Sequence, residues 1–432
     1  MTQDATKSIT NGERKKMSQV LTPDRPAAIS KQTATCKVVL LIPAYNEEES
    51  ISDTMHAALL ASPDMQFEFD IIVIADNCTD RTEEIVLGII QELGPQEEQT
   101  RVFLMKTQGN KKRKAGALNQ AFALIRELGY SFIATADADT VWDPNFLKNG
   151  LAAMEKKGEM LGGICGRVGL LPFKKEPFTS VQFTGKPISP AAIAWLMLFF
   201  FRKAAWCVRQ AWIYLWWGFQ NVEYCIGQAE TIERMGKAHC LCGPGTICRA
   251  NVLEELYQKF GVVWPETMVE DFDMTIRMQM LGYETRVGHD MFVYTDCPKG
   301  FRAHGIQRER WNGGNLSTYI NVGINRHTFS GGMEMGLQLV WFACRINLIV
   351  TAIQIWMTGF VYIDRIGFVL LMVPLLLVAG LNMFRFKYVA YKSLFQFLLL
   401  VCFGYELYAL RYGIVLTKSY LKAFTKSITR WR

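Results

Sequence analysis

The chain has 432 residues, which is enough for two or three domains and for a large buried core. Half of its residues are hydrophobic, 12% are aromatic and only 20% are charged. This balance excludes a disordered, collagen-like or disulfide-rich protein. The net charge of +7 is modest for this length, so the location of the cations carries more information than their number.

Eleven cysteines are scattered along the chain. An odd number without paired spacing indicates reduced thiols in a protein that faces a cytosol. The tightest group is Cys240, Cys242 and Cys248 beside His239, but this spacing lacks the paired ligands of a structural zinc site. We therefore interpret these cysteines as buried thiols.

Residues 1–35 are polar, and we expect them to form a flexible tail. After them, short apolar runs alternate with helical stretches. These runs are residues 38–42, 70–75, 102–105 and 131–136. Such alternation predicts βαβ units and an α/β domain with a mostly parallel sheet. Ligands bind such sheets at the carboxyl ends of the strands, where Tyr45, Asp76 and Asp137–Asp139 follow the runs.

The composition changes at residues 189–220, which hold five of the eleven tryptophans. Arg202, Lys203 and Arg209 are interleaved with these rings. The apolar run 191–201 is too short for a bilayer, which needs about 20 residues. Aromatic side chains mixed with cations are typical of an interfacial helix or hairpin on a membrane. A buried pair of helices is the alternative interpretation.

Three apolar stretches follow, at residues 340–361, 366–384 and 393–416, and they predict transmembrane or interfacial helices over 336–416. The basic tail 417–432 carries five cations and is expected on the cytosolic side. If the α/β domain shares that side, the number of crossings is even, which favours two spans with the third stretch at the interface. We expect a multi-pass protein of the cell membrane with its α/β domain in the cytoplasm.

Paired carboxylates stand at the end of the fourth apolar run. Asp137 and Asp139 alternate on an extended segment, where they suit a divalent cation shared with substrate phosphates. Hard oxygen ligands favour Mg²⁺ or Mn²⁺. A capping turn is the alternative. Asp76 suits hydrogen bonds from a base or a ribose, or an N-cap of the next helix.

Cations and acids open two further helical stretches. Residues 111–114 are four successive cations before a predicted helix, which suits a diphosphate or a solvated loop. Glu270 and Asp271 open an amphipathic stretch, where a carboxylate is a candidate general base.

A third group is predicted to share one helix face, because Gln307, Arg310 and Trp311 are spaced 0, 3 and 4. Arg310 suits a departing phosphate, and the Trp311 ring suits a stacked sugar.

Taken in order, these segments resemble the family 2 glycosyltransferases over about residues 37–311. The segments that carry the resemblance are Pro43-Ala44-Tyr45-Asn46-Glu47, Ala75-Asp76-Asn77, Lys114 to Asn119, Asp137-Ala138-Asp139, Cys242-Gly243-Pro244-Gly245, Glu270-Asp271 and Gln307-x-x-Arg310-Trp311. Their order is most similar to the membrane-embedded processive branch of cellulose, chitin, hyaluronan and poly-N-acetylglucosamine synthases. The last motif, downstream of the Glu-Asp pair, is the most specific.

The resemblance implies roles for the matching positions in donor binding. Pro43, Tyr45 and Glu47 would border the uridine, and Asp76 would bind the uracil. The remaining donor contacts fall to Lys114, which would approach the diphosphate, and to Asp137 and Asp139, which would hold the metal ion and the diphosphate.

The same resemblance implies roles around the acceptor. Asp271, beside Glu270, would be the catalytic base. The acceptor terminus would be lined by Gly243, Pro244 and Gly245. The diphosphate and the growing end would be contacted by Gln307, Arg310 and Trp311.

The resemblance also implies a fold and an activity. The expected fold is a GT-A type domain over 36–335, and the expected reaction is inverting transfer from a UDP-sugar to a growing polysaccharide, with N-acetylglucosamine as the first choice of sugar. Mg²⁺ or Mn²⁺ is the expected cofactor. The expected partners are a glycan or glycolipid acceptor and a lipid bilayer, with a homo-oligomer left open and no nucleic acid. The alternatives are a nonprocessive transferase that adds one sugar to a lipid phosphate or lipid-linked glycan, and a catalytically silent nucleotide-sugar-binding protein.

Overall fold

The computed structural model forms two compact units. The first comes from residues 1–167 and 236–294, and the second from residues 168–235 and 295–432. The structure describes residues 36–61, 67–94, 100–178, 190–230, 237–323, 325–358, 394 and 404–425. The domain bounds expected from the sequence stay predictions.

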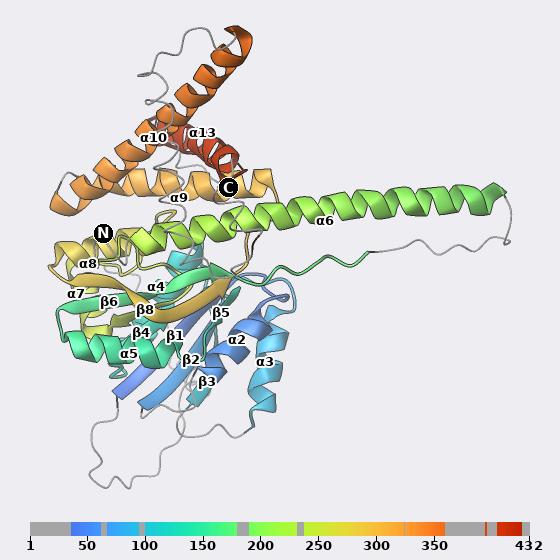
Figure 1. Cartoon of the computed structure of the whole chain (residues 1–432). Coiled ribbons are helices and arrows are strands. Elements are labelled where there is room, and N and C mark those ends of the chain that lie inside the picture. The colour runs from blue at the N-terminus through green and yellow to red at the C-terminus, as the bar shows by residue number, and fades with distance from the viewer. Residues whose placement is uncertain are drawn as a thin grey trace. The chain divides into compact units, whose positions relative to one another are not determined.

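Eight strands form one sheet. Their bounds are β1 Cys36–Ala44, β2 Phe67–Ala75, β3 Thr100–Lys106, β4 Phe132–Thr135, β5 Thr140–Trp142, β6 Leu161–Leu170, β7 Thr246–Arg249 and β8 Glu284–Thr295. Their order in the sheet is β3-β2-β1-β4-β7-β6-β8-β5 (Figure 1). β1 pairs in parallel with β2 and β4, and β2 pairs in parallel with β3.

The predicted α/β class is confirmed, but the sheet is mixed rather than mostly parallel. β7 is antiparallel to both of its neighbours, β4 and β6. The segment Thr246–Arg249 has only four residues, and a strand of that length has no sequence pattern that reveals its direction.

Among the described residues of the first unit, six helices flank the sheet. Their bounds are α2 Ile51–Leu60, α3 Thr82–Glu92, α4 Arg113–Ile125, α5 Phe146–Lys157, α7 Ala250–Phe260 and α8 Glu270–Met280. The alternate residues Val39 and Leu41 of β1 join a buried cluster with Leu118 of α4, Leu253 of α7 and Met278 of α8. Every residue from 38 to 42 is fully buried, as expected for a strand covered on both faces. This packing holds α4 and α8 against the sheet.

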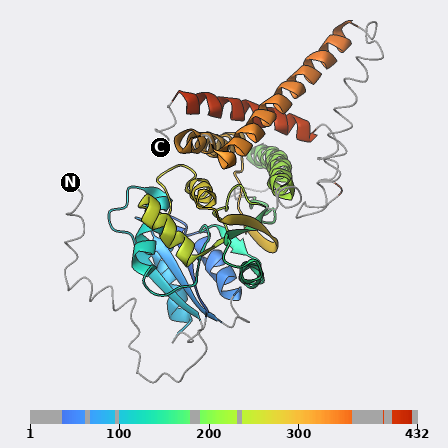
Figure 2. The ribbon, with the colours of Figure 1, turned by 90° about the vertical axis from the view of Figure 1, so that its left-hand side faces the viewer.

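The described part of the second unit is mainly helical (Figures 1 and 2). Its helices are α6 Pro190–Glu230, α9 Phe301–Val322, α10 Arg326–Thr358 and α13 Gly404–Phe424. α13 contacts both α9 and α10. The aromatic segment 189–220 contributes to α6, a single helix of 41 residues rather than a hairpin.

Within the described ranges, no helix combines the length and the apolar character that a membrane span requires. The predicted span 366–384 lies outside the described residues, as do the tail 1–35 and residues 426–432. The stretches 340–361 and 393–416 are described in part.

Candidate active site

Three neighbouring parallel strands end at one edge of the sheet. Pro43 lies near the end of β1, and Ala44 is paired in register with the last residue of β2. The backbone N–H of Asp76 then donates to the Ala44 carbonyl at 2.8 Å, and the N–H of Ala136, after β4, donates to the Leu41 carbonyl at 3.1 Å. The acidic residues predicted after these strands therefore start from the same edge, as the rule for parallel sheets requires.

Asp76 is 8% exposed and is held by three side-chain donors. Its Oδ1 accepts from Thr107 Oγ1 at 2.7 Å and from Asn77 Nδ2 at 2.9 Å, and its Oδ2 accepts from Asn110 Nδ2 at 2.8 Å. Asn110 reaches this position because residue 116 is glycine, where a Cβ atom would collide with Asn110 Oδ1. The carboxylate is thus fixed in orientation before any ligand arrives.

The loop after β1 carries two of the predicted uridine-bordering residues. Tyr45 is 61% exposed, so its ring is accessible to a ligand. The Glu47 backbone N–H donates to Thr82 Oγ1 at 2.8 Å, and its Oε2 accepts from Ser50 Oγ at 2.8 Å. Burial, followed by the negative charge of Asp137, raises the pKa of Glu47. The sheet edge therefore concentrates carboxylates.

Lys114, in the first turn of α4, pairs with carboxylates from two other elements. Its Nζ forms ion pairs with Asp137, just after β4, and with Glu270 at the start of α8, the latter at 3.3 Å. Burial acts to lower the pKa of Lys114, but the charges of Asp137, Glu270 and Asp271 outweigh it, and the pKa is raised. Lys114 is therefore a permanent cation at the centre of this acidic group.

Gly243 lies directly against this ion pair. A Cβ atom at residue 243 would lie 2.6 Å from Lys114 Nζ and 3.3 Å from Asp137 Oδ2. The Gly243 backbone N–H donates to Asp271 Oδ2 at 3.0 Å. A glycine is required here because only a residue without a side chain brings its N–H to Asp271 so close to Lys114.

Pro244 and Gly245 are anchored by neighbouring side chains. The Pro244 carbonyl accepts a hydrogen bond from Trp142 Nε1 at 3.1 Å. A Cβ atom at residue 245 would lie 2.6 Å from Val293 and 3.0 Å from the Phe146 ring. The loop 243–245 is therefore closely packed on the sheet.

Asp271 has the electrostatic property of a general base. Burial and the adjacent charge of Glu270 raise its pKa to about 7, against the opposing effect of Lys114. Its Oδ1 accepts from the Phe272 N–H at 2.8 Å, and its Oδ2 accepts from Gly243. A carboxylate with a pKa near the working pH accepts and releases protons efficiently.

Asp137 and Asp139 are the predicted metal ligands. Burial, followed by the charges of Asp137 and Glu47, raises the pKa of Asp139 to about 6. Within the described ranges, no three His, Cys, Asp or Glu side chains are grouped to hold a metal ion by themselves. Mg²⁺ is commonly bound by one or two carboxylates together with substrate phosphates. The two mutually repelling carboxylates of Asp137 and Asp139 therefore fit a site in which the substrate supplies the remaining ligands of the cation.

The thiols near this loop show no zinc site within the described residues. Cys240, Cys242 and Cys248 are free thiols, and Cys248 is buried.

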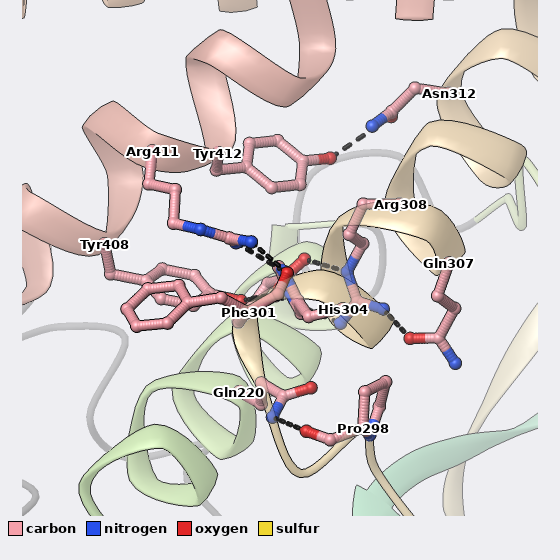
Figure 3. Close-up of polar contacts among 11 residues, drawn as sticks. Gln220, Pro298, Phe301, His304, Gln307, Arg308, Asn312, Tyr408, Arg411 and Tyr412 are labelled. Carbon is pink, nitrogen blue, oxygen red and sulfur yellow. Dashed lines mark hydrogen bonds and ion pairs between the residues drawn. The ribbon is translucent and has the colours of Figure 1, made fainter. Parts of the chain in front are cut away.

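The remaining predicted residues, Gln307, Arg310 and Trp311, lie in the second unit, on α9. Figure 3 shows Gln307. Gln307 Oε1 accepts a hydrogen bond from Arg308 Nη1, and the Arg308 guanidinium lies 4.2 Å from the ring centroid of Trp311. Arg310 is exposed. Gln307 and Trp311 thus share the neighbour Arg308, which the helical spacing of the motif did not predict.

Several supporting residues carry no motif of their own. Thr107 and Asn110 hold Asp76, and Arg308 contacts Gln307 and Trp311. The signal of all three in the sequence is only proximity to a motif. Thr107 and Asn110 are neutral polar loop residues without a period, and Arg308 is one of several cations on its helix.

Comparison with known proteins identifies the family of the chain. Residues 39–257, half of the chain, match the family described as glycosyl transferase family 2. Residues 222–384 match the related glycosyl transferase family group 2. The chain therefore belongs to glycosyl transferase family 2, and it is a glycosyltransferase enzyme.

Two curated relatives are similar over parts of their length. The probable glycosyltransferase YdaM of Bacillus subtilis is 27% identical over 283 residues, which cover 65% of this chain and 55% of YdaM. The poly-beta-1,6-N-acetyl-D-glucosamine synthase of Staphylococcus aureus is 29% identical over 106 residues, which cover 24% of this chain and 22% of the synthase. The chain thus spans little more than half of the first relative and less than a quarter of the second.

Solved structures give weaker similarity. The mannosyltransferase PcManGT from Pyrobaculum calidifontis, in complex with GDP-Man and Mn²⁺, is 16% identical with a TM-score of 0.48, over 94% of this chain and 92% of that chain. S. aureus TarS 1–349 in complex with UDP-GlcNAc is 13% identical with a TM-score of 0.39, over 88% and 91%. Scores below 0.5 do not by themselves establish a common fold.

Proposed function

We propose that this glycosyltransferase is an inverting membrane enzyme that transfers a sugar from a UDP-sugar to the hydroxyl end of a growing polysaccharide. The observation that carries the proposal is Asp271, a buried carboxylate with a pKa of about 7 beside the Lys114–Asp137 ion pair. A proton acceptor and a cation at the edge of an α/β sheet are what sugar transfer from a nucleotide needs.

In this proposal the donor is bound along the sheet edge. Asp76, already fixed by three donors, accepts hydrogen bonds from the uracil, and Tyr45 borders the uridine with its exposed ring. Lys114 approaches the diphosphate. Asp137 and Asp139 are the residues that would hold Mg²⁺ or Mn²⁺, and the bound cation would offset negative charge on the diphosphate.

The transfer step assigns the proton to Asp271. Its carboxylate takes the proton of the acceptor hydroxyl as that oxygen attacks the anomeric carbon from the face opposite the nucleotide. The new glycosidic bond forms as the bond to UDP breaks, and UDP leaves with the electron pair, so the anomeric configuration inverts. Lys114 stabilises the negative charge on the leaving diphosphate.

We propose N-acetylglucosamine as the sugar. The support is the similarity to the poly-beta-1,6-N-acetyl-D-glucosamine synthase of S. aureus over 106 residues. The run from Ala75 to Asp80, which follows the second strand, is similar to the same group of synthases. Both observations bear on the identity of the donor sugar. The proposed acceptor and the proposed processive synthesis rest on the resemblance of the motif order.

We also propose that the enzyme acts at the cell membrane, with its catalytic domain in the cytoplasm and membrane spans within 336–416. Support comes from the first half of α6, where Met197, Phe201 and Val208 are each about 70% exposed. Arg202 and Lys203 lie among these apolar side chains. Apolar side chains next to cations suit the surface of an anionic bilayer.

The proposal is tested by UDP release from detergent-purified protein over a panel of UDP-sugars, with Mg²⁺, Mn²⁺ or EDTA, followed by sizing of the product. Metal-dependent turnover of UDP-N-acetylglucosamine into a ladder of long chains is the expected result. A product with a single added sugar would replace the polymer synthase with a nonprocessive transferase. UDP binding without turnover of any donor or acceptor would contradict the catalytic assignment. Asp290→Asn, which changes a carboxylate that is 77% exposed, is the matched control for variants of the buried acids.

A further inference from the structure

A carboxylate outside the predicted motifs joins three helices of the second unit. Glu223 of α6 meets His304 and Arg308 of α9 and Tyr408 of α13. Figure 3 shows the last three of these residues. Arg308 is only 1% exposed and His304 is fully buried, whereas Glu223 keeps 21% of its side chain exposed. A guanidinium this deeply buried requires a fixed anionic partner.

Glu223 is that partner. Its Oε1 accepts from Arg308 Nε at 2.7 Å, and its Oε2 accepts from Arg308 Nη2 at 3.1 Å, which is a bidentate pair. Burial opposes ionisation, but the charge of Arg308 outweighs it and lowers the pKa of Glu223 to about 2. The pair is therefore fully charged at neutral pH.

The neighbouring residues fix the carboxylate of Glu223 in turn. The Tyr408 hydroxyl donates to Glu223 Oε2. Arg411 Nη1 lies 3.0 Å from His304 Nδ1, and because arginine only donates, Nδ1 is the acceptor. The proton of neutral His304 then sits on Nε2, which lies 2.8 Å from the Tyr408 hydroxyl and 3.4 Å from Glu223 Oε2.

Arg308 transmits this order to two motif residues. Its Nη1 donates to Gln307 Oε1, so the amide nitrogen of Gln307 points away from the guanidinium (Figure 3). Its guanidinium also lies 4.2 Å from the ring centroid of Trp311, within the range of a cation–π contact. One arginine thus sets the amide orientation of Gln307 and supports the ring of Trp311.

We propose that Glu223 is a positioning residue of the transferase, which acts through Arg308 to hold Gln307 and Trp311 in the orientation that contacts substrate. The inference rests on the proposed function and on the family resemblance, which implies that those two residues contact substrate. Glu223 itself touches no reacting atom.

The test compares Glu223→Gln, Arg308→Gln and the double variant with wild type, and uses Glu176→Gln as the matched control. Glu176 forms an ion pair with a different arginine, Arg209 of α6, at 3.2 Å. Glu223→Gln leaves the buried Arg308 cation without its anion. Misplaced contact groups are expected to lower kcat/KM by about 10²-fold.

The double variant distinguishes positioning from bulk stability. If Glu223 acts through Arg308, the double variant has the same kcat/KM as Arg308→Gln alone. Once Arg308 is removed, Glu223 has no further effect on Gln307 and Trp311. The double variant also removes the unpaired charge, so it keeps the test valid if Glu223→Gln folds poorly. Losses that multiply in the double variant, or wild-type kcat/KM in Glu223→Gln, would overturn the proposal.

A measurement without turnover separates this inference from the proposed function. In protein labelled with 5-fluorotryptophan, the ¹⁹F resonance of Trp311 is assigned by its loss in Trp311→Phe. We expect Glu223→Gln to shift or broaden that resonance and Glu176→Gln to leave it unchanged. An unmoved resonance in Glu223→Gln refutes the positioning role, whereas a moved resonance in a protein that turns over no sugar donor refutes only the proposed reaction.

Discussion

Replacing Asp271 with asparagine removes the proton acceptor while keeping the shape of the side chain. We expect Asp271→Asn to abolish transfer and to leave UDP binding largely intact, because the side chains assigned to UDP, among them Asp76, Lys114 and Asp137, are unchanged. Loss of general-base catalysis lowers kcat by about 10²–10⁴-fold, which corresponds to about 3–5 kcal/mol of transition-state stabilisation.

The pKa of Asp271 sets the pH dependence of the wild-type enzyme. Burial and Glu270 raise this pKa from 3.8 to about 7. Because the base must lose its proton before it acts, kcat/KM rises with pH and reaches half of its plateau near pH 7.

The raised pKa of Asp271 also affects the stability of the fold, which falls as the pH rises, whereas activity increases. A carboxyl whose pKa is higher in the folded state contributes stability that is fully present below about pH 4 and is lost as the pH rises through about 7. The difference of about three pH units corresponds to about 4 kcal/mol. The asparagine side chain of the Asp271→Asn variant does not ionise. As the pH is raised from 5 to 8, wild type therefore loses stability that the variant keeps.

Three measurements check this prediction: UDP release as a function of pH, UDP binding by calorimetry, and urea unfolding at pH 5 and pH 8. Asp290→Asn, on the exposed part of β8, serves as the control in each. An equal loss of UDP binding and transfer in Asp271→Asn would refute the base assignment. So would a wild-type pH profile that is flat through pH 7.

The other predictions concern the metal ligands, the glycine loop and a buried ion pair. Asp139→Ala should weaken metal-dependent UDP binding, and a metal titration curve that matches wild type would count against the ligand role. Gly243→Ala places a Cβ atom 2.6 Å from Lys114 Nζ, so kcat/KM should fall by about 10²-fold with the fold retained; wild-type kinetics would disprove the close approach. Asp70→Asn removes the buried partner of Arg101 and should lower the free energy of unfolding by about 3 kcal/mol in urea titrations, whereas a change near zero would show that the pair adds no stability.

Much of the sheet was predictable because its parallel strands are continuous apolar runs. Residues 38–42 and 70–75 are almost entirely buried in β1 and β2, where covered strands need no alternation of polar and apolar residues. The direction of β7 could not be predicted in the same way. A strand of four residues is too short to show a hydrophobic period, and its sequence does not reveal which strands it pairs with.

The candidate site was predictable where acidic residues directly follow those runs. Asp76 and Asp137 were found at the sheet edge by this argument. Thr107 and Asn110, which hold Asp76, were not found, since a neutral loop residue has no pattern that points to its partner.

The pairing of Glu223 with Arg308 was beyond any local pattern. The two residues are 85 positions apart, and only the packing of α6 against α9 within the second unit brings them together. A motif therefore identified Gln307 and Trp311, whereas the residues that orient them required the structure.

The most direct test of inverting transfer is the anomeric configuration of the product. The enzyme is given UDP-N-acetylglucosamine, whose sugar is α-linked to the diphosphate, and the new glycosidic bond is assigned from its anomeric proton coupling by NMR. A β-linked product is the result we predict, because the base Asp271 directs attack from the face opposite UDP. An α-linked product would contradict the proposed mechanism, and the absence of any new glycosidic bond with every UDP-sugar would contradict the proposed donor class.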